Sequence, residues 1–434
     1  MPSYTSGGHD MIGRLWSAVS AWMRQVWEDL KASTDTSLLG LARFFGLLYG
    51  PIDRHLRIDQ ALRKAWSYRL PGHVNWRHAL GGITYLLFLV LIVTGVLLSF
   101  YYRPSAQEAY QSIQHIVSEV RFGWLMRNLH VWTANLIVIA VLAHMARVFF
   151  AGAYKPPRET NWLVGLLLLG TVLAFGASGY LLPWDQWAYW SVTEVLNALD
   201  RVPVVRHVVA IVLKGDVIVS GATLSRYFAI HVIILPWIAL VLLGFHFTML
   251  RKHGIAPPKY PPEVEKPGVP FFPHHLLRTL LISVLVLSVA VSLAALYPRP
   301  VADQASAFEL PDQLVSSWVP VSVSLALIRY MGTWGFVGFS LLGLAMALLP
   351  LVDRGPERRL RKRPIVAVLG FTFFIGYLVL WVVGRQLGSL PPSAPVEPAA
   401  MEEPAGPPVP LPEIGPSPVR PALPDSGSTG RRAP

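Results

Sequence analysis

The chain has 434 residues, of which 53% are hydrophobic and only 14% charged, so its composition is too apolar for an ordinary soluble enzyme. The formal net charge of +12 could suggest nucleic-acid binding, but the basic residues crowd into a few stretches beside apolar runs, which indicates membrane topology and contact with anionic lipid instead. The sequence contains no cysteine, which excludes disulfides, thiolate-ligated iron–sulfur clusters, c-type haem attachment and a cysteine nucleophile, but not a haem held by imidazoles.

The N-terminal stretch 11–31, MIGRLWSAVSAWMRQVWEDLK, repeats apolar side chains at helical spacing. This pattern predicts an amphipathic helix that lies on the cytoplasmic surface of the membrane. A helix packed against a partner subunit would have the same pattern, and both interpretations stay open. We expect no cleavable signal peptide, because the chain begins with polar residues and its first apolar residues are periodic and not continuous.

Seven long apolar runs follow, and each is long enough to cross a bilayer as a helix. They predict an all-α, polytopic membrane protein. We place them near residues 78–102, 126–151, 160–182, 227–250, 275–297, 331–352 and 365–386.

Basic residues gather before the first run, after the fourth and after the sixth. Because loops rich in lysine and arginine stay on the cytoplasmic side, the N-terminus is expected in the cytoplasm and the C-terminus in the periplasm of a bacterial inner membrane.

Two of the apolar runs carry matched pairs of histidines. His130 and His144 lie in the second run, and His231 and His246 lie in the fourth. At roughly 100° per residue, steps of 14 and 15 return near the same helix face, about 21 Å along the axis. A lone histidine in an apolar helix is usually a satisfied core residue. Two facing helices with two pairs can instead hold two haem irons, one above the other across the membrane.

Glycines in the neighbouring runs repeat at the same pitch. Gly81 and Gly95 in the first run, and Gly165 and Gly179 in the third, are each 14 residues apart. Such glycines leave room for the edges of two porphyrins, although membrane helices also carry glycine for close packing.

Three arginines lie beside the histidines near the ends of the runs, namely Arg127, Arg147 and Arg226. Haem propionates need a cation there. Ordinary snorkelling of arginine toward the membrane surface is the alternative.

The organisation along the chain follows from these patterns. We expect a cytoplasmic N-terminal segment (1–70), a four-helix dihaem part (71–260), a three-helix part (261–390) and a disordered tail rich in proline (391–434).

Residues 71–256 also contain long motifs, including LGGITYLLFLVLIVTGVLLSFYYRP, EVRFGWLMRNLHVW, YKPPRETNW, GASGYLLPWDQWAYW and TLSRYFAIHVIILPW. These strings resemble cytochrome b of the quinol–cytochrome c oxidoreductase complexes, most of all the shorter type of the plastoquinol complexes. The 15-residue step from His231 to His246 is typical of that type. Residues 270–390 resemble the three-helix remainder of the family more weakly, which suggests a fusion of two parts that plastoquinol complexes keep as separate chains.

The resemblance implies roles for the histidines and arginines. His130 and His231 would ligate a low-potential outer haem, and His144 and His246 a high-potential haem near the cytoplasm. Arg127 and Arg226 would meet propionates of the outer haem, and Arg147 those of the inner haem.

The resemblance also implies two quinone sites and several partners. Quinol would be oxidised at an outer site framed by Pro183, Trp184, Asp185 and Tyr189. One electron would pass to a Rieske iron–sulfur protein and on to a cytochrome c or an equivalent subunit. The other would cross both b haems to a quinone site near the cytoplasm. The family implies a dimeric complex in contact with lipid, and no nucleic acid.

This chain departs from the family at two places. Ala79 replaces the cysteine that binds an extra haem covalently in the plastoquinol type, so we expect two non-covalent b haems and no covalent one. The Pro-Glu-Trp-Tyr motif of the outer site is missing. Alignment on Arg329 places Ser316-Ser317-Trp318-Val319 there, and alignment on the proline places Pro311-Asp312-Gln313-Leu314.

Asp312 is therefore a candidate proton acceptor, with Tyr189 as a second catalytic candidate and Glu309 as a substitute. Alternatively, the segment is only an amphipathic surface helix.

The sequence thus favours the dihaem cytochrome b subunit of a quinol-oxidising bc-type complex, which is not active alone. One alternative is a dihaem electron wire in a modified complex without a working outer quinol site. The other is a non-redox membrane scaffold, which the four histidines disfavour.

Overall fold

The protein is described here by a computed structural model that covers residues 69–257, 268–271, 275–312, 314 and 318–387. It also covers Ser17, Ser20, Ala21 and Arg24, which are helical. The rest of the predicted amphipathic helix at 11–31, and the whole tail 391–434, lie outside the described residues.

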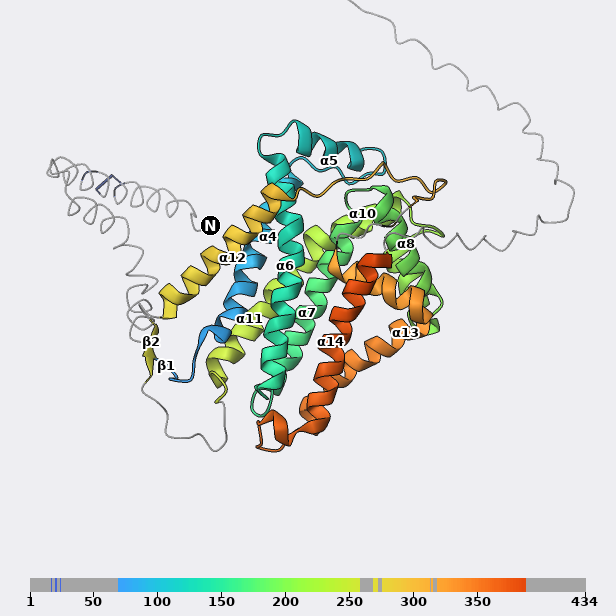
Figure 1. Ribbon diagram of the computed structural model, residues 1–434. Coiled ribbons are helices and arrows are strands. Elements are labelled where there is room, and N and C mark those ends of the chain that lie inside the picture. Colours follow the sequence, from blue (N-terminus) through green and yellow to red (C-terminus); the bar gives the residue numbers. More distant parts are fainter. Residues whose placement is uncertain are drawn as a thin grey trace, which may run out of the picture. The chain divides into compact units, whose positions relative to one another are not determined.

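The described chain is almost entirely helical, as the apolar runs predict (Figure 1). Its two strands, β1 (Arg69–Leu70) and β2 (Val269–Pro270), form one short antiparallel pair in which Arg69 lies opposite Pro270. The helices are η1 (Trp76–Ala79), α4 (Leu80–Ser99), α5 (Ala109–Ser118), α6 (Gly123–Phe150), α7 (Glu159–Tyr180), α8 (Gln186–Asp200), α9 (Pro203–Val208), η2 (Val209–Lys214), α10 (Gly221–Ala229), η3 (Ile230–Ile234), α11 (Leu235–His253), α12 (Leu276–Leu296), α13 (Val319–Val352), η5 (Leu360–Lys362) and α14 (Pro364–Leu387).

Six spans among the described residues are long and apolar enough to cross a membrane. Each overlaps one of the predicted runs, so the protein is a multi-pass membrane protein. Their bounds are Trp76–Ser99, Gly123–Phe150, Glu159–Tyr180, Gly221–His253, Leu276–Leu296 and Pro364–Gly384.

The remaining predicted run, 331–352, forms only the second part of a bent helix. Within α13, the segments Pro320–Gly335 and Val337–Val352 meet at 86°. Gly332 has φ +63° and ψ −167°, a combination that only glycine adopts without strain, and it interrupts the helix at this point. The sequence predicted the apolar second half but not the helical first half, whose polar and small residues do not form a continuous apolar run.

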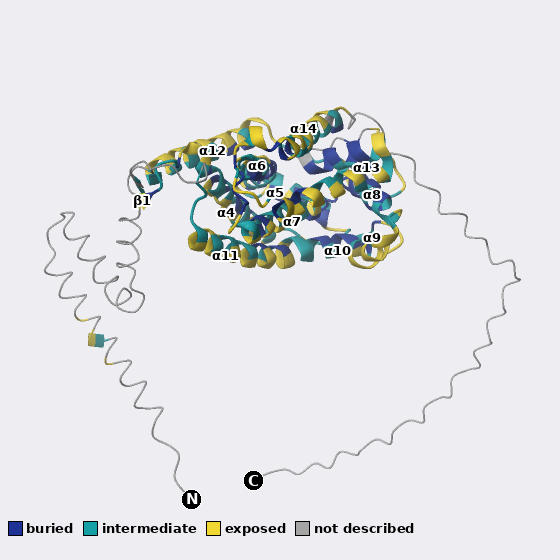
Figure 2. Ribbon diagram, turned by 90° about the horizontal axis from the view of Figure 1, so that it is seen from below, coloured by how far each residue is buried: buried dark blue, intermediate teal, exposed yellow. Residues whose placement is uncertain are grey.

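Four helices, α4, α6, α7 and α11, form a bundle (Figure 2). Helix α4 packs along α6, and α7 packs along α6 and α11, so the two histidine-bearing helices α6 and α11 lie on opposite sides. Buried side chains such as Leu87 and Ile137 fill the centre. Helix α12 covers α4 and α6, and α14 packs against α13 and α6.

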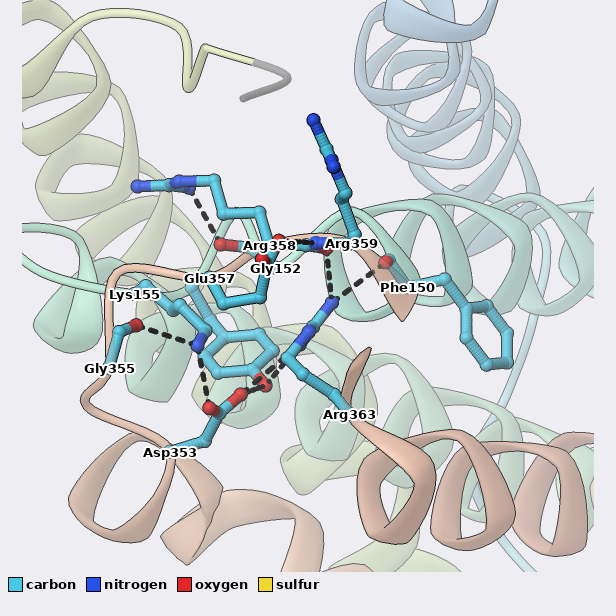
Figure 3. Close-up of polar contacts among 10 residues, drawn as sticks. Phe150, Gly152, Lys155, Asp353, Gly355, Glu357, Arg358, Arg359 and Arg363 are labelled. Atoms are coloured by element: carbon cyan, nitrogen blue, oxygen red, sulfur yellow. Dashed lines mark hydrogen bonds and ion pairs between the residues drawn. The ribbon is translucent and has the colours of Figure 1, made fainter. Parts of the chain in front are cut away.

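A buried polar cluster joins this bundle to the three-helix part (Figure 3). Asp353, which follows α13, accepts hydrogen bonds from Lys155 (2.6 Å) and Arg363 (3.1 Å). Tyr154 donates a short hydrogen bond to the same carboxylate. Arg358 completes the contact by donating to the Gly152 carbonyl at 2.7 Å. Tyr154, Lys155 and Gly152 belong to the α6–α7 loop, whereas Asp353 and Arg358 belong to the α13–α14 connection, so these contacts hold the two parts together.

Candidate functional site

The four predicted histidines all lie inside the four-helix bundle. The ring centres of His130 on α6 and His231 in η3 are 6.3 Å apart, with the planes inclined at 66°. His144 and His246 lie on the same two helical segments, about four turns further along. The bundle therefore carries histidines at two levels, one toward α8 and one toward the α6–α7 loop.

In the upper pair, His130 and His231, the Nδ1 atom of each ring makes a hydrogen bond. Nδ1 of His231 lies 2.9 Å from the carbonyl oxygen of Phe175, which can only accept, so this nitrogen carries the proton. Nδ1 of His130 lies 2.8 Å from Oγ1 of Thr94, whose own proton goes to the Val90 carbonyl at 2.7 Å. Both rings therefore present Nε2 with a free lone pair, the form of imidazole that binds a metal.

The lower pair, His144 and His246, differs in the hydrogen bonding of its Nδ1 atoms. Nδ1 of His246 is buried and has no hydrogen-bond partner among the described residues.

Each of the four predicted glycines faces one of the four histidines. A Cβ atom added at Gly81 would lie 3.2 Å from the ring of His144, and one at Gly165 would lie 3.9 Å from that of His246. At the other level the corresponding distances are 3.2 Å from Gly95 to His130 and 2.5 Å from Gly179 to His231. The matched pitch of glycines and histidines thus reflects direct contact across two helix pairs, α4–α6 and α7–α11.

The longer step between His231 and His246 has a local structural explanation. His231 lies in η3, a π-helical turn in which the Leu235 N–H bonds the carbonyl of Ile230, five residues earlier. Pro236 follows and lacks the N–H that would continue the regular pattern. A π-turn accommodates one extra residue. A step of 15 residues across it therefore returns to the same face as 14 residues in a regular helix.

The three predicted arginines have separate surroundings. Arg127 is buried and donates to the Arg299 carbonyl at 2.7 Å. Arg226 donates to the Ile211 carbonyl at 2.7 Å and covers Gly215, which has a positive φ. Arg147 lines a cavity beside the lower histidine level.

This cavity of about 500 Å³ lies at the end of the bundle that carries the α6–α7 loop. Among the described residues, its lining includes several cationic or imidazole side chains and no carboxylate. Its polar lining residues are His73, Asn75, Arg77, His78, Arg147 and Arg358. Sequence reasoning found Arg147 but missed the others, because they come from three separate segments.

At the opposite end, the Pro-Trp-Asp segment begins α8. Trp184 has a positive φ of 53°, and Asp185 caps the helix by accepting the Ala188 N–H at 2.9 Å. Asp185 also accepts the Ala302 N–H, so the α12–α13 connection is held against α8. Burial raises the pKa of the Asp185 carboxyl, and the backbone hydrogen bonds oppose that rise. Tyr189 is buried, and its hydroxyl donates to the Val219 carbonyl at 3.0 Å.

The candidate acids of the outer site do not lie in a buried pocket. Asp312 and Glu309 are both exposed. Ser316 and Ser317 lie outside the described residues, and Trp318 precedes α13 with its indole packed against Gly176 of α7. Glu194 on α8, which sequence reasoning missed, is a buried carboxylate in this region. Its signal was that Glu194 is the one charged residue in the stretch SVTEVLNAL.

A multi-pass helical protein with two levels of histidines in one bundle belongs to the class of membrane haem proteins. Residues 65–254 match the family model described as Cytochrome b/b6/petB. Cytochrome b6 of Desmonostoc sp. (strain PCC 7906) is 40% identical over 211 residues, which are 49% of this chain and 98% of that protein. Cytochrome b6 of Mastigocladus laminosus is 41% identical with the same coverage.

A solved structure, described as hyperthermophilic respiratory Complex III, extends the likeness. One of its chains is 29% identical, with a TM-score of 0.70, and the match covers 78% of this chain and 93% of that one. The larger coverage means that the match continues beyond the cytochrome b6 part. The chain belongs to the cytochrome b family, with the three-helix part fused after the four-helix part, and b-type haem is the cofactor of this family.

Proposed function

We propose that the chain is the dihaem cytochrome b subunit of a quinol-oxidising bc-type complex. His130 and His231 would hold the outer haem, and His144 and His246 the inner one. The observation that carries this proposal is the position of His130 and His231. Their ring centres are 6.3 Å apart, and the Nδ1 atom of each is hydrogen-bonded to another residue.

The donor set fits haem iron. A metal–imidazole bond is about 2 Å long, so two imidazoles that hold one metal ion between them would have ring centres about 6 Å apart. The absence of cysteine leaves non-covalent binding as the mode. When bound, the haems would supply one-electron transfer across the bilayer. The chain's own residues would fix the imidazole tautomers, and the glycines would keep the space around each ring clear.

We propose that the cavity beside Arg147 is the inner quinone site and that the surface around Tyr189 frames the outer one. Tyr189 would act there by fixing the loop at Val219 and so shaping the site. Arg127, Arg147 and Arg226 would turn toward haem propionates. A Rieske-type protein and a cytochrome c or equivalent would be the redox partners, in a homodimeric complex surrounded by lipid.

Haem content tests this proposal directly. The purified chain should contain two b haems, both extractable with acidic acetone. His144→Ala should remove only the inner haem and leave the outer haem's reduced-minus-oxidised band in place, because the two levels use different histidines. One haem per wild-type chain, or loss of the outer haem alone in this variant, would contradict the assignment.

A second candidate function is a dihaem wire in a complex without outer quinol oxidation. The observation that favours it is Trp318, which stands near the position of the family's missing motif and packs tightly against Gly176. Insensitivity of haem reduction to every outer-site inhibitor would support this second function.

A further inference from the structure

A buried ion pair joins α8 to α13. The side chain of Glu194 is only 5% exposed and that of Arg329 only 16%. Nη2 of the arginine lies 3.0 Å from Oε1 of the glutamate, and Nε lies 3.4 Å from Oε2. Burying a carboxylate and its partner is costly, and a hydrophobic pair would often serve packing as well. The burial of this ion pair therefore points to a role beyond packing.

The pair lies in the region where the outer site is proposed. Glu194 follows Tyr189 by five residues on α8, about 7.5 Å along the helix. The next residue, Val195, packs against the buried cluster that includes Trp318 and Val321. In the alignment on Arg329, this arginine follows the position of the family's missing glutamate by about ten residues. Glu194 is the carboxylate that contacts it.

Other carboxylates of this region are less suited to receive a proton from a bound quinol. Asp185 is occupied as a helix cap by two backbone N–H groups. Asp303, Glu309 and Asp312 are exposed to solvent. The side chain of Asp200, at the end of α8, is 30% exposed, against 5% for that of Glu194.

Resting on the proposed function above, we propose that Glu194 is the carboxylate that accepts a proton from quinol at the outer site. One quinol O–H bond breaks, and its proton goes to a carboxylate oxygen of Glu194. The second proton leaves for the outer aqueous phase. The two electrons would leave singly, to the outer b haem and the iron–sulfur partner of the proposed function. Arg329 fixes the position of the carboxylate through two contacts.

The test uses the assembled complex in membranes and measures the rate at which quinol reduces the b haems with the inner site inhibited. Glu194→Gln keeps the size and a hydrogen-bonding oxygen but cannot accept the proton. Loss of a general base typically costs about two to four orders of magnitude, so a fall of that size is expected with both haem spectra intact. Asp200→Asn, which removes another ion-paired carboxylate from α8, is the matched control and should react at the wild-type rate.

Glu194→Asp separates chemistry from packing. It retains a carboxylate and should restore a measurable part of the rate, whereas a purely structural pair would be disrupted by the shorter side chain and the rate would not return. A normal rate in Glu194→Gln, or a comparable loss in Asp312→Asn instead, would overturn the assignment of Glu194 and leave the dihaem function standing. Absence of both haems from the wild-type spectrum would instead overturn the proposed function.

Discussion

At the scale of single residues, Gly179 and His231 form the tightest of the four glycine–histidine contacts. A Cβ at Gly179 would lie 2.5 Å from Cε1 of this ring, whose Nδ1 lies within hydrogen-bond distance of the Phe175 carbonyl and the Ser178 hydroxyl. We therefore expect Gly179→Ala to displace the imidazole and to weaken or abolish binding of the outer haem. Crowding a packed site in this way typically costs about 1–3 kcal/mol. Haem content and the reduced-minus-oxidised spectrum measure the effect.

Gly170 provides the control, because it lies on the same helix and a Cβ there would meet nothing within 4 Å. Gly170→Ala should bind both haems normally. Equal spectra for the two alanine variants would mean that the contact with His231 does not matter for haem binding.

These same contacts indicate how far residue-level prediction can go. The pitch of 14 residues pointed to Gly81, Gly95, Gly165 and Gly179 because helix geometry is regular. The partners of Nδ1, Thr94 and Phe175, could not be predicted, because a hydroxyl or carbonyl near a ring depends on how two helices rotate against each other. Glu194 was missed for a similar reason: its partner Arg329 is 135 residues away in the sequence.

At the scale of elements, the apolar runs predicted where the membrane helices lie, and the break in α13 was the main difference. The hydropathy pattern indicates only the continuous apolar run after residue 331, whereas the first half of α13 is positioned by tertiary contacts. Gly384 of α14 lies so close to the Ser322 backbone that an added Cβ would be 2.0 Å from its carbonyl oxygen. Sequence patterns within one helix contain no information about such a crossing.

The contact between the loops at 152–157 and 353–363 predicts that the stability of the protein depends on pH. Burial alone would raise the pKa of the Asp353 carboxyl, but hydrogen bonds from Lys155, Tyr154 and Arg363 outweigh it and lower the pKa. A carboxyl whose pKa is lower in the folded protein stabilises it above the unfolded value of about 3.9, and this contribution is lost as the pH falls through the folded pKa. Asp353→Asn should therefore lower the Tm at neutral pH.

Removing one partner of a buried pair typically costs about 3–5 kcal/mol, because Lys155 is left unneutralised. Thermal unfolding in detergent, followed from pH 7 downward, measures the difference. The gap in Tm between wild type and variant should narrow as the wild-type carboxyl becomes protonated. A gap that does not change with pH would show that the ionised carboxylate is not what stabilises the connection.

At the scale of the whole molecule, the bent α13 decides the topology of the C-terminal part. If Val337–Val352 and α14 each cross the bilayer once, the 353–363 connection and the N-terminal segment share the cytoplasmic side, where their arginines and lysines belong. The C-terminal tail then lies in the periplasm. A reporter that is active only outside the cytoplasm should work when fused after residue 386 and fail when fused at residue 355.

Activity at 355 would place the cavity beside Arg147 and Arg358 on the periplasmic side, since Arg358 reaches it from that same connection. The two haem levels would then exchange their inner and outer roles, and Glu194 would face the cytoplasm. The orientation of one loop therefore determines on which side of the membrane quinol oxidation by this chain would release its protons.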